Sequence, residues 1–179
     1  MADDILALTR AILPTTPPRW TSLAQQVPAD LLTRAPAPGE WSALECLQHL
    51  VDTERLVFPV RIRALLAGQD FPAFDPDAQG DLQAAPSGPA DLAASFAALR
   101  ADNLALLATL TPADLDRQAR HAELGIVSLG ELLHEWVSHD LMHTIQAERA
   151  LLQPFILGCG PWQSYFQDHL AQNPASGAA

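Results

Sequence analysis

The strongest constraint on the fold of this chain is a pair of helix-start motifs, each followed by a long stretch with apolar residues at helical spacing. The motifs are SALE at residues 42–45 and SLGE at residues 128–131. Both fit the capping box, in which a serine and a glutamate three positions later satisfy the free amides at a helix N-terminus. Apolar residues then recur every three or four positions, as expected of helices that bury one face. We therefore predict long helices over residues 42–66 and 128–152.

Proline and glycine divide the rest of the chain. Further helices are predicted over residues 3–13, 17–27, 89–110 and 162–170. Pro59 lies inside the first long helix and should bend or split it, because proline lacks an amide donor. Gly68 should end that helix, and Pro154 should interrupt the other one near its end.

These elements predict an all-α fold, a four-helix bundle with short extra helices. No stretch is typical of a β-strand, and residues 117–127 are expected to be irregular. Residues 69–88 are rich in proline, glycine, aspartate and alanine and are expected to form a long crossover loop between the second and third main helices. The bundle should be one domain over residues 1–172, with residues 173–179 as a flexible tail.

Composition excludes several classes of function. The net charge is −11 and no basic run occurs, which argues against a nucleic-acid partner, because phosphate-backbone binding depends on clustered Lys and Arg. No apolar run reaches the roughly 18–20 residues that span a bilayer, and the acidic N-terminus lacks the features of a signal peptide. Cys46 and Cys159 are too few for a disulfide framework. We expect a cytoplasmic protein without a membrane partner.

Three histidines form the main candidate for a functional site. His139 and His143 are spaced i, i+4, which puts both imidazoles on one face of the last long helix. That face is mainly apolar, and so is the face that carries His49 in the first long helix. Three protein ligands on facing helices are the pattern of a reactive metal site, which keeps one coordination position open. The alternative is that each histidine is a hydrogen-bonded core residue.

Several neighbours of these histidines are weaker candidates. Glu45 and Asp52 lie one turn to either side of His49, so either could act as a base or an extra ligand, although capping alone explains Glu45. Asp140 could orient a ligand from the second coordination sphere or be a solvated surface residue. Cys46 could be a ligand or a buried structural thiol.

The remaining tryptophans and histidines have simpler predictions. The four tryptophans are expected mostly to anchor the core, and Trp136 could also form a pocket wall because it shares the histidine face of its helix. His134 points away from that face and is placed outside the cluster. His121 and His169 are expected at the surface.

Two segments of the chain resemble the DinB/YfiT-like superfamily. Residues 40–55, EWSALECLQHLVDTER, look like the start of its second helix, and residues 139–146, HDLMHTIQ, look like its second motif. Residues 71–75 and 160–162 are similar as well, so the resemblance extends over nearly the whole chain. It implies a four-helix bundle, often dimeric, that binds a divalent metal, zinc or nickel, through three histidines. By their place in the motifs these are His49, His139 and His143.

The resemblance also implies a choice of activities. Relatives include S-transferases that use low-molecular-weight thiols such as bacillithiol or mycothiol, a thiol-dependent isomerase, and metal-dependent hydrolases. We therefore expect a metal-dependent enzyme, a thiol S-transferase or a hydrolase, that acts on a small-molecule substrate. The alternative from another class is a non-enzymatic, stress-related metal-binding protein.

A second apolar row on each long helix is compatible with a homodimer interface or with placement in the interior of the bundle. The two rows are Leu44, Leu47, Val51 and Phe58 in one helix, and Leu133, Val137, Leu141 and Ile145 in the other.

Overall fold

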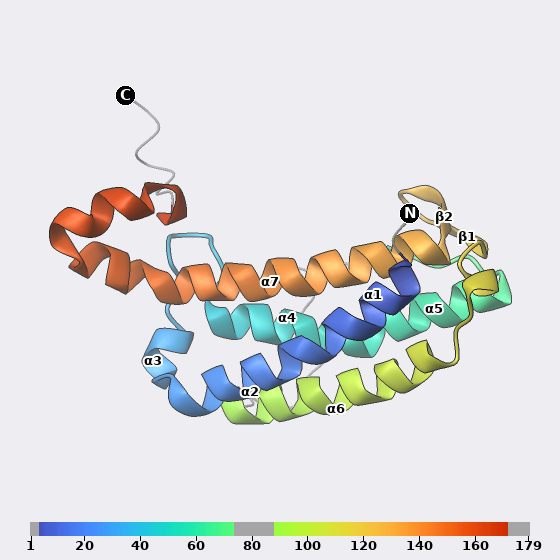
Figure 1. Ribbon diagram of the computed structural model, residues 1–179, viewed down its shortest axis with the longest axis horizontal. Coiled ribbons are helices and arrows are strands. Elements are labelled where there is room, and N and C mark those ends of the chain that lie inside the picture. The colour runs from blue at the N-terminus through green and yellow to red at the C-terminus, as the bar shows by residue number, and fades with distance from the viewer. Residues whose placement is uncertain (1–3, 74–87, 172–179) are drawn as a thin grey trace.

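The computed structural model describes residues 4–73 and 88–171, in which four columns of helix form a bundle (Figure 1). The predicted fold class is confirmed. The columns are α1 (Ile5–Ile12) with the 3-10 helix η1 (Leu13–Thr15) and α2 (Thr16–Gln26); α4 (Ala43–Leu56) with α5 (Phe58–Ala67); α6 (Pro89–Ala108); and α7 (Leu129–Gly158). Short extra helices, α3 (Ala29–Leu32) and η3 (Pro112–Asp114), lie in the connections.

The order of the columns around the bundle differs from their order in the sequence. The first column packs mainly against α6 and α7, and α4 packs against the same two helices, so the first and second columns lie on one diagonal. Figure 1 shows α4, α5 and α6 all running in the same direction. The end of α5 and the start of α6 therefore lie toward opposite ends of the bundle. Residues 74–87 of that connection, and the predicted tail at 173–179, lie outside the described residues.

The helix predicted over residues 42–66 is split at its proline. The Ser42 hydroxyl accepts from the Glu45 amide, and the Glu45 carboxylate accepts from the Ser42 amide, so the capping box is confirmed. α4 ends and α5 begins so that Pro59 falls in the first turn of α5, where no amide donor is needed. Gly68 ends α5 at φ 63°, a left-handed conformation that glycine adopts without steric cost.

The prediction that residues 117–127 are irregular, and that no strand is present, is wrong. β1 (Gln118–His121) and β2 (Gly125–Ser128) form an antiparallel hairpin. The backbone of Phe71 extends this pairing, because its amide donates to the Arg120 carbonyl and its carbonyl accepts from the Ala122 amide. Strands this short depend on pairing with a distant segment, which local periodicity does not show.

The predicted end of the last long helix is also wrong, because α7 continues through Pro154 to Gly158. The last turns of α7 are hydrogen-bonded to the segment that follows them. Gln153 donates to the His169 carbonyl and accepts from the Ala171 amide, and Arg149 donates to the Leu170 carbonyl. That segment, predicted as a helix over residues 162–170, is the 3-10 helix η4 (Gly160–His169), and its Tyr165 is 79% exposed.

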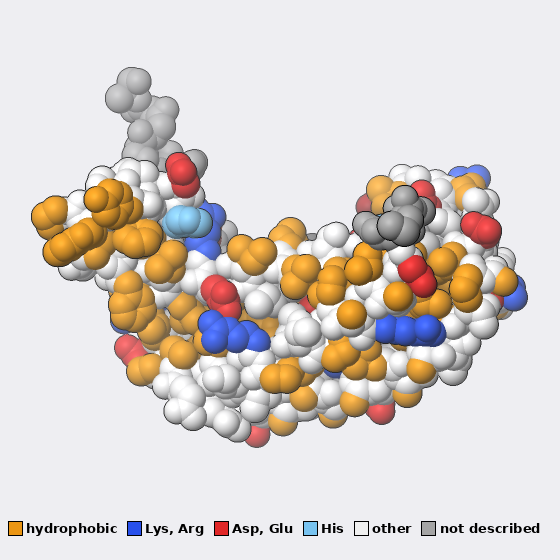
Figure 2. Space-filling view, in the orientation of Figure 1, with side chains coloured by type: hydrophobic (Ala, Val, Ile, Leu, Met, Phe, Trp, Pro, Cys, Tyr) orange, Lys and Arg blue, Asp and Glu red, His pale blue; other side chains and the backbone are white. Residues whose placement is uncertain are grey.

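The second apolar row is buried on one of the two long helices and partly exposed on the other. On α4 and α5, Leu47, Val51 and Phe58 are buried inside the bundle. On α7 the row begins buried at Leu133 and becomes exposed toward the C-terminus, where Ile145 is 66% exposed. Figure 2 shows that the outline of the molecule is hollowed between the η4 end and the hairpin end. The homodimer stays a prediction. Among the described helices, none is both long and apolar enough to cross a bilayer.

The apolar core consists of two clusters. One surrounds Phe58, Leu107 and Leu133 toward the hairpin end of the bundle. The other surrounds Trp20, Leu47 and Phe96 toward the α3 end. Large-to-small changes in such clusters destabilise proteins through lost burial and the cavity left behind. Each column also contributes buried polar residues, among them Thr16, Glu54, Arg100 and Asp140.

These polar residues form a layer across the middle of the bundle. Arg100 on α6 is fully buried and donates to Glu54 on α4 at 2.9 Å and to Asp140 on α7 at 2.6 Å. Thr16 at the start of α2 donates to Asp140 at 2.8 Å, and Asn103 donates to Glu54 at 2.8 Å. All four columns thus contribute to one hydrogen-bonded unit.

The layer is stable only as a unit, because a buried charge needs a partner of opposite sign. Burial would lower the pKa of the Arg100 guanidinium, but Glu54 and Asp140 outweigh that effect and raise this pKa above its ordinary value. The indole of Trp136 completes the layer by donating to Glu54 at 2.7 Å. Sequence reasoning did not identify this network.

Removing the central cation should be costly. In Arg100→Met two buried carboxylates lose their partner, so we expect the free energy of unfolding to fall by about 3–5 kcal/mol. Urea denaturation measures this. The matched control is Arg19→Met, which removes an exposed ion pair with Glu148 and should cost less than about 1 kcal/mol. Equal losses in the two variants would contradict the role of the layer.

Candidate metal centre

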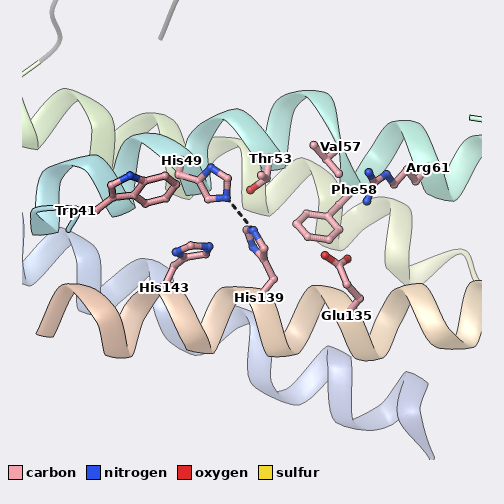
Figure 3. Close-up of a pocket in the computed structure, with 9 residues that line it drawn as sticks. All are labelled: Trp41, His49, Thr53, Val57, Phe58, Arg61, Glu135, His139 and His143. Carbon is pink, nitrogen blue, oxygen red and sulfur yellow. Dashed lines mark hydrogen bonds between the residues drawn. The ribbon is translucent and has the colours of Figure 1, made fainter. Parts of the chain in front are cut away.

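The three predicted histidines meet between two packed helices, His49 on α4 and His139 with His143 on α7 (Figure 3). The Nε2 atoms of His49 and His139 lie 2.9 Å apart. One ring nitrogen from each of the three residues falls within 4.8 Å of the others, close enough to share one ion. The three side chains come from elements some 90 residues apart, and their convergence on one point suggests a site for a divalent metal.

The environment keeps the imidazoles in the form that binds metal, which is the neutral one. His49 and His143 are buried, and His139 is half-buried. Burial, followed by repulsion from the other two histidines, lowers the pKa of His139 to about 3. Burial, followed by repulsion from His49, lowers the pKa of His143 to about 4. Neither ring has to lose a proton to bind a metal at neutral pH.

Two neighbours fix the orientation of the rings. Gln146 Oε1 lies 2.9 Å from His143 Nδ1, so this nitrogen donates to the amide oxygen and Nε2 is left with its lone pair. The Trp41 indole stacks on His143, with ring centroids 5.6 Å apart and planes 20° apart, and lies against His49 as well. Such outer-sphere contacts orient metal-binding imidazoles and set their affinity.

The residues present fit a metal ion by a second observation. His139 Nδ1 is buried and has no hydrogen-bond partner among the described residues. A buried polar atom in this state costs free energy. The other nitrogen of the ring, Nε2, faces His49 Nε2 at 2.9 Å, and three neutral imidazole nitrogens gathered at one point are a donor set that suits a divalent ion such as zinc or nickel.

A pocket of about 360 Å³ opens beside the histidines (Figure 3). Trp41, Val57 and Phe58 give it an apolar wall. Arg61 and Glu135 line its other end. A site that combines ligand-binding histidines with an apolar cavity and a few polar groups has the usual character of a small-molecule site.

Glu135 is a candidate that sequence reasoning missed. It precedes His139 by one turn of α7, and its carboxylate points toward the pocket between the two long helices (Figure 3). Protein atoms around the carboxylate raise the pKa of Glu135, and the charge of Arg61 partly offsets this. The signal that could have found it is its spacing, since residues 135, 139 and 143 are each one turn apart.

Comparison with known proteins agrees with this fold. The model of the DinB superfamily matches residues 13–147, which include all three histidines. The chain belongs to the DinB superfamily. A similar solved structure is that of YfiT from Bacillus subtilis, described as a probable metal-dependent hydrolase with an unusual four-helix bundle topology. It is 23% identical with a TM-score of 0.70, over 87% of this chain and 90% of that one, a likeness that shows the fold. No curated protein matches the chain significantly.

The weaker candidates do not line the pocket of this DinB-superfamily chain. The Glu45 carboxylate is used in the capping box of α4, and Asp52 accepts from Gln48 at 3.1 Å. Burial, followed by the charge of Glu45, raises the pKa of the Cys46 thiol to about 12, which favours a buried structural thiol. Asp140 is neither solvated nor bonded to a histidine in the described contacts, because it belongs to the polar layer.

The predictions for the tryptophans and for the other three histidines are confirmed in part. Trp136 is fully buried and supports the pocket only indirectly, by stacking on Phe58 with ring centroids 5.0 Å apart. Trp162 is exposed and anchors no core. His134 lies outside the cluster and His169 is exposed, as predicted, but His121 is buried in the hairpin. Because the hairpin was not predicted, the burial of His121 within it could not be predicted either.

The lowered pKa values have a consequence for stability. Unfolded histidine has a pKa of about 6.5, so below that pH the unfolded state binds protons that folded His139 and His143 do not. We expect the metal-free protein to be most stable above pH 6.5 and to lose about 2 kcal/mol per histidine between pH 7 and 5. Denaturation at several pH values measures this. His143→Gln should flatten the dependence by one histidine's share, whereas His134→Gln should not; equal slopes would contradict the lowered pKa.

Proposed function

We propose that this protein is a metal-dependent enzyme in which a small nucleophile attacks an electrophile held in the pocket, and that hydrolysis is its reaction. The observation that carries the proposal is the position of the Glu135 carboxylate, which lines the pocket one turn from His139; its raised pKa agrees with that position. A carboxylate with a raised pKa beside a metal site is suited to act as a general base near neutral pH.

The residues of the chain would divide the work. His49, His139 and His143 would hold a divalent ion, with zinc or nickel as the proposed metal. Such an ion supplies Lewis acidity and lowers the pKa of a water or thiol at its open position. Glu135 would take the proton of the attacking water and return it to the leaving group. The wall of Trp41, Val57 and Phe58 would exclude bulk water and hold the apolar part of the substrate.

A thiol S-transferase is the second candidate. The supporting observation is that the pocket, at about 360 Å³, has room for a second small molecule beside the histidines, and that Arg61 offers a cation at its far end. Some low-molecular-weight thiols carry carboxylates that such a cation could bind. A thiol needs no separate base once a metal has lowered its pKa, so this reaction would depend less on Glu135.

Metal analysis tests the site itself. We expect about one divalent ion per chain after mild purification, and loss of that ion in His139→Ala. The matched control is His134→Ala on the same helix, which should keep the ion because His134 is exposed. No stoichiometric metal in the unchanged protein, or full retention in His139→Ala, would contradict the proposal.

A panel of esters and amides, and of electrophiles offered with a low-molecular-weight thiol, tests the reaction. For a hydrolase, Glu135→Gln should keep its metal and lower kcat by about 10²–10⁴-fold, the usual contribution of a general base. Asp52→Asn, outside the pocket, should leave kcat within about twofold. Turnover only with thiol and little effect of Glu135→Gln would favour the S-transferase. Inactivity across the panel would favour the non-enzymatic metal-binding alternative.

A further inference from the structure

Arg61 and His121 meet at the end of the pocket that lies away from the histidine cluster. Arg61 on α5 lines both the main pocket and a second cavity of about 170 Å³. His121 on β1 lines the second cavity, and its Nε2 lies 3.3 Å from Nη2 of Arg61. Phe71 holds both side chains, since its ring lies 5.6 Å from the Arg61 guanidinium and 5.6 Å from the His121 ring. The pair is therefore fixed by packing.

The hydrogen bonds of His121 define which of its nitrogens carries the proton. The backbone amides of Glu123 and Leu124 both donate to Nδ1, at 3.1 and 3.3 Å. An imidazole nitrogen that accepts has no proton, so in the neutral ring the proton is on Nε2. That nitrogen faces the guanidinium of Arg61, which has donors and no acceptor. Two donors therefore point toward one small region and cannot satisfy each other.

Among the described residues, no carboxylate accepts a hydrogen bond from this pair. No carboxylate of the described residues forms an ion pair with Arg61. Glu131 also lines the second cavity, but its carboxylate accepts from the amide and hydroxyl of Ser128. Glu135 lines both cavities and affects Arg61 only at longer range. A half-buried cation beside a second donor is a site for an anion.

We propose that Arg61 and His121 bind the carboxylate group of the substrate, so that its electrophilic end lies toward His49, His139 and His143. Binding of the carboxylate follows from the donor pair alone, whereas its role in catalysis rests on the proposed function. A single carboxylate matches two donors 3.3 Å apart. A phosphate dianion needs more donors than these two, and its double charge would be repelled by Glu135 more strongly than the single charge of a carboxylate.

The apolar surfaces on either side indicate the rest of the ligand. Val57 and Phe58 line the main pocket next to Arg61, and Leu124, Val127 and Leu132 line the second cavity. The carboxylate should therefore belong to a small molecule with an apolar body. The substrate class is a carboxylic acid with an electrophilic carbon, such as an ester or amide, a few bonds from the carboxylate.

Binding of phenylacetate to the full-length, metal-loaded protein tests the proposal without turnover. We expect phenylacetate to bind at least tenfold more tightly than phenylacetamide, its neutral counterpart, and more tightly than phenyl phosphate. Arg61→Gln should weaken phenylacetate binding by about ten- to a hundredfold, as for loss of a charge-assisted hydrogen bond. The matched control Arg63→Gln changes an exposed arginine on the same helix and should stay within threefold.

Two further measurements keep the test decisive. In NMR spectra the His121 Nε2 and Hε1 resonances should shift on addition of phenylacetate, which a purely structural role of His121 would not produce. If Arg61→Gln does not fold, Arg61→Lys, which keeps the charge, should bind phenylacetate more weakly than the unchanged protein does, but more tightly than this variant binds phenylacetamide.

Two results would overturn the proposal. Tight phenylacetate binding that is unchanged by the Arg61 substitutions would indicate that the anion binds the metal instead. Tighter binding of phenyl phosphate would overturn the carboxylate assignment. Metal content is measured separately, so either result leaves the metal proposal standing.

Discussion

The buried charge of Arg100 is the constraint on which the rest of this structure depends. A cation in the centre of a bundle is stable only where carboxylates reach it, and here one comes from α4 and the other from α7. The alignment of both helices along the bundle axis is therefore fixed at Glu54 and Asp140. The apolar clusters on either side supply most of the stability through burial. They do not by themselves fix how far one helix is displaced along another.

The metal centre follows from that alignment. Asp140 is adjacent to His139 in α7, and Glu54 lies little more than one turn after His49 in α4. Because Glu54 and Asp140 are both fixed against Arg100, His49 and His139 are brought together, with their Nε2 atoms 2.9 Å apart. The layer holds two carboxylates and one guanidinium, so it places a net negative charge behind the histidines. The negative charge of Asp140 acts in the direction that raises the pKa of His143, and it would likewise favour a bound cation.

Much of the bundle could be predicted because its determinants are local. Capping boxes, proline positions and apolar spacing act within a few residues of the helices they define. The three histidines were predictable for the same reason, with the family motifs selecting which of them to name. The polar layer was not predicted, although Arg100 and Asn103 occupy the same stripe of α6 as the buried Phe96 and Leu107. A charged residue on a core stripe identifies a buried network only once its distant partners are known.

The hairpin and the far end of the pocket show the same limit. β1 is stabilised by Phe71, some fifty residues earlier in the chain, and this pairing buries His121 beside Arg61. The candidate site thus extends beyond the histidines predicted from sequence, with a carboxylate at Glu135 and a donor pair at Arg61 and His121. The three histidines and Glu135 line one pocket, and the proposed anion anchor at Arg61 and His121 lies where that pocket meets the second cavity, so that together they would orient a substrate.

The central claim is that three imidazoles hold one ion and leave a position open for a ligand from solution. X-ray absorption spectroscopy of the metal in the purified protein tests this most directly. We expect scattering from three imidazole rings and from an additional oxygen or nitrogen ligand that changes when a small inhibitor is added. A sulfur ligand at about 2.3 Å, or a coordination shell filled by protein side chains alone, would contradict it.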